Sequence, residues 1–199
     1  MAKGFLARTV TPAVKEMQEH YYGEAGNVPE MKDVSLRARE TDFIASRDSF
    51  YMSTVGETGW PYMQHRGGPK GFLKTLAPDQ LAFADFKGNR QLLTVGNTSA
   101  NDRVCLFFMD YVNRTRLKIL GHVEIFDASE HPEMVDELAT PDTLDLVERI
   151  VKIQVVSFDW NCPYHITQRF DEIEAGGMIA SLQKRVLELE AQVKRLKSH

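Results

Sequence analysis

The residues best suited to chemistry lie between Tyr62 and Gln91, where basic side chains alternate with glycines, short apolar runs and aromatics. The basic residues of this stretch are Arg66, Lys70, Lys74, Lys87 and Arg90. A phosphate needs charged donors and free backbone N–H groups, whereas a flat ring system needs apolar or aromatic walls. Because one stretch supplies both, it predicts a pocket for a flat ligand that carries a phosphate.

The end of this stretch, with the sequence DFKGNRQ, is typical of a phosphate seat. Gly88 permits a tight turn, and Asn89 is a good N-cap for a helix that begins at Arg90. Such a helix presents unpaired N–H groups and the positive end of its dipole to an anion, and Lys87 and Arg90 add charged donors. The alternative is a capped helix whose basic residues are only solvated.

The beginning of the stretch indicates contacts with the ring of the ligand. Strand alternation places Gln64 and Arg66 on one face and His65 on the other, while glycines such as Gly67 let a ring approach the backbone closely. We therefore expect Gln64 and Arg66 to contact the ligand. His65 is expected to be packed or at the surface rather than catalytic.

Three later residues are further candidates. Arg116 opens an alternating strand, where it is either solvated or lines the cofactor. Trp160 and Arg169 lie in a dense polar and aromatic run that follows a strand, which favours a loop contributing to a site. Trp160 either forms a wall for a flat ring or plugs the end of the barrel, and Arg169 is suited to phosphate or carboxylate. Cys162 has no assignable partner histidine, so a reactive thiol has weak support.

The elements that must position these residues are mainly β. Strands are predicted at 49–55, 60–66, 72–76, 80–84, 103–110, 116–126 and 152–160. Helices are predicted between Thr11 and Gly23 and at 40–46, 90–97 and 130–139, with a turn at 142–150. Short apolar or alternating runs bounded by turn signals favour a small antiparallel barrel with flanking helices over a βαβ sheet.

The C-terminal segment has a different pattern, because six apolar residues follow an a/d heptad repeat. They are Ile179, Leu182, Val186, Leu189, Val193 and Leu196. Ile or Val at a with Leu at d favours two parallel strands of a coiled coil, in which Arg185 at g faces Glu190 at e of the partner. The alternative is one amphipathic helix packed on its own barrel, since a coiled coil usually needs three to four heptads.

Bulk properties exclude several classes of protein. The 199 residues, 43% of them hydrophobic, are enough for one compact domain with appendages. A net charge of −4 argues against a general nucleic-acid binder. Two cysteines and no recognisable leader indicate a reducing, cytoplasmic environment, and no apolar run approaches the roughly 20 residues that span a membrane. Rossmann, P-loop and zinc motifs are lacking, and the scattered histidines predict no metal site.

Taken in order, these segments resemble the pyridoxamine 5′-phosphate oxidase-like family of FMN-binding split barrels, especially its predicted flavin-nucleotide-binding branch. The supporting segments, between about Glu40 and Arg169, are DSFYMSTV, GWPYMQHRGGPKGFLK, LAFADFKGNRQ, RLKILGHVEIF and FDWNCPYHITQR. The resemblance implies an antiparallel split β-barrel that holds FMN at the interface of a homodimer. The expected organisation is a helical segment at 1–46, the barrel at 47–175 and the C-terminal helix at 176–199.

The resemblance also assigns site residues. Asn89, Arg90 and Gln91 match the phosphate segment of the family, and Arg116 matches a polar residue that contacts the flavin. With the residue patterns above, the predicted cofactor-binding set is Gln64, Arg66, Gly67, Lys74, Lys87, Asn89, Arg90, Gln91, Arg116, Trp160 and Arg169. In this set, Trp160 and Arg169 resemble the late aromatic and arginine that close the site.

Departures from the family pattern limit the functional expectation. Ala84-Asp85 stands where true oxidases carry a Tyr-Thr pair, Gln91 replaces a lysine, and the late arginine-histidine substrate signature is not reproduced. We therefore expect an FMN-dependent oxidoreductase whose small-molecule substrate is not pyridoxamine phosphate, with no catalytic residue assigned. The alternative is a non-catalytic carrier of a flavin, a deazaflavin or haem. Asp85 suits a phosphate site only if it pairs with Lys87 or Arg90 or faces the ribityl hydroxyls.

Overall fold

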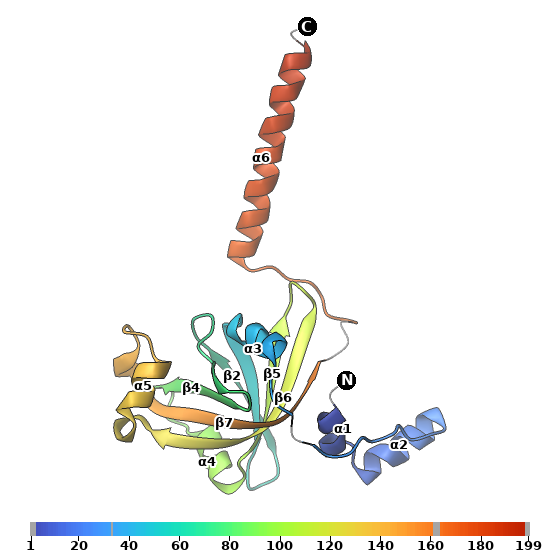
Figure 1. Ribbon diagram of the computed structural model, residues 1–199, viewed down its shortest axis with the longest axis vertical. Helices are drawn as coiled ribbons and strands as arrows, with labels where there is room; N and C mark the ends of the chain where they lie inside the picture. The colour runs from blue at the N-terminus through green and yellow to red at the C-terminus, as the bar shows by residue number, and fades with distance from the viewer. Residues whose placement is uncertain (1–2, 33, 161–163, 198–199) are drawn as a thin grey trace. The chain divides into compact units, whose positions relative to one another are not determined.

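The computed structural model describes residues 3–32, 34–160 and 164–197, and these residues form a mainly β structure with flanking helices (Figure 1). The strands are β1 (Ser49–Val55), β2 (Pro61–Gly67), β3 (Lys74–Ala77), β4 (Gln80–Phe86), β5 (Arg103–Asp110), β6 (Thr115–Asp127) and β7 (Val147–Trp160). The helices are α1 (Lys3–Thr9), α2 (Pro12–Tyr22), α3 (Ala38–Ala45), α4 (Leu93–Ala100), α5 (Pro132–Leu138) and α6 (Glu172–Lys197), with short 3₁₀ turns η1 (Ala128–Glu130) and η2 (Leu144–Leu146). The expected mainly β class is confirmed.

The strands form one sheet that curls upon itself. Their order is β2-β1-β5-β6-β7-β4-β3, and the pairs β1–β2, β1–β5, β3–β4, β4–β7 and β6–β7 are antiparallel. Although β2 lies at one edge of this order, Arg66 Nη1 on β2 donates to Asp85 Oδ1 on β4 at 2.6 Å. In the described residues β2 is hydrogen-bonded as a strand to β1 alone, so side chains rather than a backbone ladder join it to β4. The result is a barrel with an open seam.

Alternation along the strands builds the core inside the barrel. Phe50 is fully buried, and its ring lies 5.6 Å from that of Phe83 and 5.2 Å from that of Phe108. On β6, Leu117 and Ile119 are both 0% exposed, as expected for the apolar face of that strand. Burial of each such side chain contributes about 1.5–3 kcal/mol to folding. This core fixes which face of each strand points inward and therefore which residues can reach the end of the barrel.

Most predicted strands agree with the structure to within two residues at each end, but β7 starts earlier than predicted. It begins at Val147 rather than Lys152, and the turn predicted at 142–150 is reduced to η2. The first residues of β7 pair with β4, where Asp85 lies opposite Arg149 and Ala84 opposite Ile150. Sheet pairing therefore overrides the weakly helical pattern of this segment.

The phosphate-seat helix was predicted to begin at Arg90 with Asn89 as its N-cap, and this prediction is wrong. Helix α4 begins at Leu93, and the cap position is Leu92 with a φ of 53°. Arg90 also has a left-handed φ of 61°, which a right-handed helix does not accommodate. Asn89 Oδ1 instead accepts the N–H of Gln91 at 3.1 Å, so Asn89 closes a local turn.

Other helix signals are confirmed. The Thr11 side chain accepts the N–H of Val14 at 3.3 Å at the start of α2, and Gly23 ends that helix with a φ of 80°. At the start of α6, Asp171 Oδ1 accepts the N–H of Glu174 at 2.7 Å, and the Glu174 carboxylate accepts the N–H of Asp171. This reciprocal pair is a capping box.

The chain divides into two compact units, residues 1–109 with 116–162 and residues 110–115 with 163–199. The first unit contains the barrel, and the second contains α6. The six heptad residues of α6 are 43–80% exposed in the single chain. The C-terminal helix is thus confirmed, whereas its pairing as a coiled coil stays a prediction.

No helix in residues 3–32, 34–160 or 164–197 combines the length and hydropathy needed to cross a membrane. In the same described ranges, no group of three or more His, Cys, Asp and Glu side chains is arranged to hold a metal ion.

Candidate functional site

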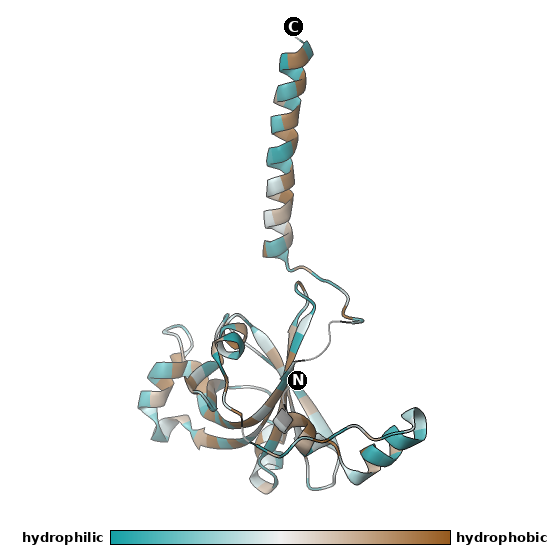
Figure 2. Cartoon of the chain, turned by 45° about the vertical axis from the view of Figure 1, so that its right-hand side comes forward, coloured by the Kyte–Doolittle hydropathy of each residue, from teal (hydrophilic) through white to brown (hydrophobic). Residues whose placement is uncertain are grey.

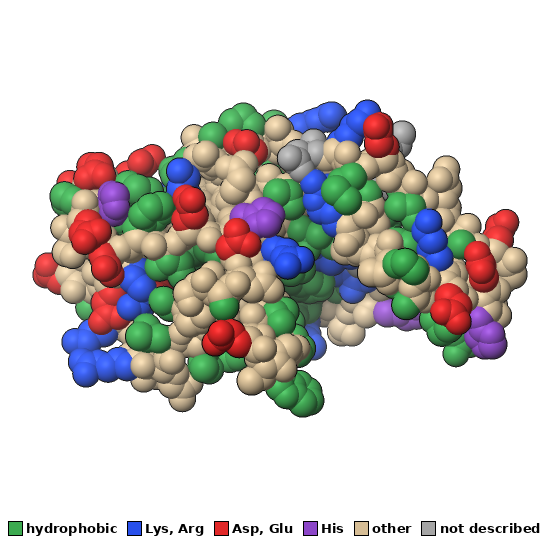
Figure 3. Space-filling model, turned by 90° about the horizontal axis from the view of Figure 1, so that it is seen from below, with side chains coloured by type: hydrophobic (Ala, Val, Ile, Leu, Met, Phe, Trp, Pro, Cys, Tyr) green, Lys and Arg blue, Asp and Glu red, His purple; other side chains and the backbone are tan. Residues whose placement is uncertain are grey.

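A polar pocket lies where the inner faces of β2, β4 and β7 approach the start of α4. Its volume is about 180 Å³. It is lined by Tyr62, Gln64, Arg66, Asp85, Phe86, Gly88, Asn89, Arg90, Gln91, Leu92, Leu93, Thr94, Val95 and Arg149. Burial alternates along β2, so that Tyr62, Gln64 and Arg66 share the less exposed face, as predicted. Figure 3 shows basic, acidic and hydrophobic side chains intermixed on one face of the molecule.

The centre of the pocket is an ion-pair cluster of Arg66, Asp85 and Arg149. Asp85 Oδ1 accepts from Arg66 Nη1 at 2.6 Å, and Asp85 Oδ2 accepts from Arg149 Nε at 2.9 Å. The three side chains are only 9–16% exposed. The carboxylate thus separates two guanidinium groups that would otherwise repel each other in a poorly solvated place. The condition that Asp85 pairs with Lys87 or Arg90 is not met, because its partners are Arg66 and Arg149.

Arg66 retains hydrogen-bonding capacity inside this cluster. Its Nε is buried and has no hydrogen-bond partner among the described residues, and its guanidinium lies 5.7 Å from the ring centre of Phe83. A buried donor without a partner costs free energy unless a ligand or water satisfies it. An anionic group is the acceptor that best matches an arginine.

The second wall of the pocket is the loop before α4 together with the first turn of that helix. Thr94 Oγ1 donates to Gln64 Oε1 at 3.0 Å, which ties α4 to β2. Leu93, Thr94 and Val95 provide the first N–H groups of the helix, which have no acceptor within the helix itself. Although α4 starts later than predicted, its positive end therefore still lines the pocket.

Five of the predicted site residues line this pocket. They are Gln64, Arg66, Asn89, Arg90 and Gln91. Gly67, Lys74 and Lys87 do not line it, although each comes from a neighbouring segment, and all three are exposed. The basic character of Lys74 and Lys87 was visible in the sequence, but the direction of their side chains was not.

The remaining predicted residues lie elsewhere. Arg116 and Lys118 share the face of β6 opposite to its core residues, and the buried Nε of Arg116 has no partner in the described part of the chain. Trp160 Nε1 donates to Glu40 Oε1 at 2.7 Å, and its ring packs edge-on against Phe43, so Trp160 acts as the plug of the barrel end. Arg169 belongs to the other unit, where its guanidinium lies 4.9 Å from the ring centre of Tyr111.

Sequence reasoning missed Arg149, Tyr62 and Thr94. Arg149 lies two residues after Val147 and two residues before Val151. Strand alternation would therefore have placed Arg149 on the inner face if the predicted strand had begun at Val147. Thr94 gave no signal, because its role depends on the end of β2 lying beside α4.

The cysteines give no support for thiol chemistry. Burial raises the pKa of the Cys105 thiol, and the nearby positive charge of Lys118 only partly opposes this effect. A raised pKa keeps the thiol protonated and therefore unreactive at neutral pH. Cys162, the other candidate thiol, lies outside the described residues.

Comparison with known proteins identifies the family. The family model for pyridoxamine 5′-phosphate oxidase matches residues 36–149, which include β2, β4, α4 and Arg149. The chain belongs to the pyridoxamine 5′-phosphate oxidase family. Proteins of the pyridoxamine 5′-phosphate oxidase family typically bind a flavin. The search of curated proteins found no match.

Several solved structures are similar to this family member. A candidate pyridoxamine 5′-phosphate oxidase from Lactobacillus delbrueckii is 16% identical, with a TM-score of 0.50 over 65% of this chain and 99% of that one. An FMN-binding protein from Syntrophomonas wolfei is 13% identical, with a TM-score of 0.43 over 61% and 83%. An F420 reductase is 18% identical, with a TM-score of 0.43 over 59% and 94%. At such identities only the fold is transferred, and only from the Lactobacillus delbrueckii protein, whose TM-score reaches 0.50.

Proposed function

We propose that this chain is a flavoprotein that binds FMN and holds the phosphate of FMN in the pocket between β2, β4 and α4. The observation that carries the proposal is the pair of arginines held by Asp85, one of which has a buried Nε without a partner. Three arginines and one carboxylate line the pocket, so it suits a dianion. The start of α4 adds backbone N–H donors of the kind that bind phosphate.

The complete site is formed by two copies of the chain. The pocket of one chain, about 180 Å³, is smaller than the roughly 300–1,000 Å³ that holds a whole cofactor. The opposite faces of β1, β2 and β5 carry neighbouring apolar side chains, among them Tyr51, Val55, Met63 and Phe107. Met63 is 63% exposed, and an apolar patch of this kind marks an interaction surface. A second copy would cover it and supply the remaining walls of the flavin site.

We further propose that the protein is an oxidoreductase acting on an unidentified small molecule. Bound FMN supplies the capacity to accept and donate hydride or electron pairs. The residues of the chain bind and orient it: Arg66 and Arg90 neutralise the phosphate, Gln64 is held by Thr94, and Tyr62 and Phe86 provide apolar walls. Asp85 occupies a place where the family carries a hydroxyl residue, which supports a substrate other than pyridoxamine phosphate.

One observation favours a second candidate, a carrier of a flavin or deazaflavin that catalyses nothing quickly. No histidine or cysteine is among the described residues that line the pocket, so a general acid or base near neutral pH is lacking there. Steady-state assays with reduced nicotinamides and oxygen separate the two. Turnover above that of free FMN supports the oxidoreductase, and tight cofactor binding without turnover supports the carrier.

The phosphate assignment is tested by replacing Arg66. Arg66→Ala removes charge-assisted hydrogen bonds of about 1.5–3 kcal/mol, so the Kd for FMN should rise roughly 10- to 100-fold. Binding is followed by fluorescence titration of the purified protein with FMN and with riboflavin, which lacks the phosphate. Riboflavin affinity should change much less.

The control is Arg103→Ala, which removes an exposed arginine whose side chain donates to Asn101 Oδ1. Its FMN affinity should equal that of the parent. A preparation that is colourless and binds no added FMN would refute the flavoprotein proposal. Equal losses of FMN and riboflavin affinity in Arg66→Ala would refute the phosphate assignment alone.

A further inference from the structure

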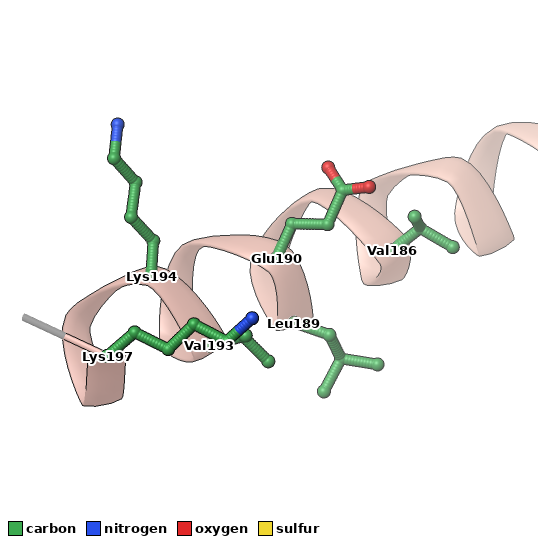
Figure 4. A pocket seen from close by; sticks show the side chains of 6 residues that line it. All are labelled: Val186, Leu189, Glu190, Val193, Lys194 and Lys197. Carbon is green, nitrogen blue, oxygen red and sulfur yellow. The ribbon is translucent and has the colours of Figure 1, made fainter.

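The apolar stripe of α6 is an exposed surface of the described chain that the proposed function leaves unused. Its six heptad residues are 43–80% exposed. Figure 2 shows hydrophobic and hydrophilic residues alternating along the ribbon of α6. In Figure 4, Leu189 and Val193 project from one side of the helix, whereas Glu190 and Lys194 project from the other. An open groove runs along the stripe between Val186, Leu189 and Val193.

The spacing of the stripe favours a helical partner over a flat surface. Its residues recur at intervals of 3, 4, 3, 4 and 3 from Ile179 to Leu196. A helix that packs on a globular core usually adds apolar residues at e or g, whereas a coiled-coil seam is restricted to a and d. Here the e and g positions that flank the seam from Gln183 onward are polar, with Arg185 and Glu190 among them. The groove therefore matches knobs from another helix with the same repeat.

We infer that this partner is α6 of a second copy, paired in parallel and in register as a two-stranded coiled coil. Ile179, Val186 and Val193 occupy a, and leucines occupy d, the combination that favours parallel dimers. In register, Arg185 at g of one copy faces Glu190 at e of the other, and the charges are opposite. The heptads begin just after Gly176 and Gly177, a pair that weakens the helix at this point.

An antiparallel pairing with the same overlap lacks this charge match. It would set e against e and g against g, so that Arg185 would meet Gln192 and Glu190 would meet Gln183. In the single chain, Arg185 Nη1 contacts Glu188 Oε2 at 3.1 Å, but both side chains are largely exposed, at 60% and 47%. An exposed ion pair of this kind contributes little free energy, so Arg185 can readily leave Glu188 and pair with Glu190 of the second copy.

The seam spans less than three full heptads, so on its own the coil would be marginal. A second contact between the same two copies would raise the effective concentration of one helix near the other, because pairing of the helices then becomes intramolecular. A parallel coil has a two-fold axis, and the usual isologous dimer has one as well, so symmetry allows the same two copies to make both contacts.

Disulfide trapping in the full chain tests the pairing and its direction. Leu182→Cys places a thiol at d, where the two copies of a parallel coil bring their Cα atoms within disulfide range. In the antiparallel alternative, residue 182 faces residue 193, and the two copies of residue 182 lie about 16 Å apart along the axis. Leu182→Cys should therefore form a covalent dimer on mild oxidation only if the helices pair in parallel.

Leu187→Cys is the matched control, because Leu182 and Leu187 are both 66% exposed but Leu187 lies at position b, outside the seam. Both variants retain the native cysteines, so background cross-linking is the same. Preferential cross-linking of Leu182→Cys supports the inference. It is overturned if both variants cross-link alike, if neither does, or if covalent dimers form only when Leu182→Cys and Val193→Cys chains are mixed. None of these outcomes depends on flavin binding.

Discussion

Asp85 determines the electrostatics of the pocket, because it is the carboxylate between two buried guanidinium groups. It lies on the inner face of β4, in line with the core residues Leu81 and Phe83. The same strand face therefore contributes to the core and places a carboxylate in the pocket. Directly opposite on β7 is Arg149, and across the open seam is Arg66. The cluster carries a net charge of +1 before Arg90 is counted.

The carboxylate is predicted to contribute strongly to stability. In Asp85→Asn, the amide cannot neutralise Arg66 and Arg149, so two poorly solvated like charges remain close together. We expect the free energy of unfolding to fall by roughly 2–4 kcal/mol, measured by urea denaturation. Glu148→Gln is the control, since Glu148 is the more exposed partner of Arg149 and is not part of the cluster. Equal stability of the two variants would contradict this account.

The site residues that were predicted from the sequence depend on patterns among neighbouring residues, whereas those that were missed depend on contacts between distant segments. Gln64 and Arg66 were placed on the correct face because strand alternation is a property of neighbouring residues. Arg149 was missed because the predicted strand began at Lys152 instead of Val147, and its contact with Asp85 spans 64 residues. No local pattern reports such a contact. Trp160 had both an aromatic-wall and a plug interpretation, and only the contact with Glu40 distinguishes them.

At the level of elements, the strands were predictable and the α4 boundary was not. β1 and β5 have the predicted bounds, since alternating apolar residues and turn residues delimit them. The loop before α4 contains Asn89, a residue that caps helices and also closes turns. Arg90 and Leu92 adopt left-handed backbone conformations, which are compatible with the turn and not with a helix. Arginine and leucine have no preference for this conformation, so the turn could not be predicted from them.

The pairing of β6 with β7 requires a residue without a side chain at Gly121. A Cβ at this position would lie 2.7 Å from Gln154 O and 2.7 Å from Ile153 Cγ2, where the register of the two strands shifts. Gly121→Ala should therefore lower the free energy of unfolding by about 1–3 kcal/mol. Gly96→Ala provides the comparison, because Gly96 lies in α4 with no atom within 4 Å of the added Cβ.

In that control, thermal unfolding should show a stabilisation of roughly 0.5–1 kcal/mol, as alanine is the better helix former. Opposite signs for the two glycines are the expected result. If Gly121→Ala leaves the free energy of unfolding unchanged, the strands must be able to shift and accept the methyl group.

For the whole molecule, the proposed dimer makes a prediction about the exposed faces of β1, β2 and β5. Met63→Glu places a charge in the apolar patch, so the barrel interface should weaken. The dissociation constant of the dimer, measured by analytical ultracentrifugation, should rise at least about tenfold. Met31→Glu is the control, because Met31 is 62% exposed, like Met63 at 63%, but lies outside the sheet. A dimer unaffected by Met63→Glu would place the interface elsewhere.

The contact between Arg66 and Asp85 joins β2, at one end of the strand order, to β4, the strand next to the other end, across the seam of the barrel. A phosphate bound beside it would add a second bridge over the same gap, so closure of the barrel and occupancy of the pocket are thermodynamically linked. Ligand that binds only the closed form stabilises it by RT ln(1 + [L]/Kd), about 2.7 kcal/mol at a hundredfold excess over Kd. The cofactor would then act as a structural clasp, and its loss would loosen the fold itself.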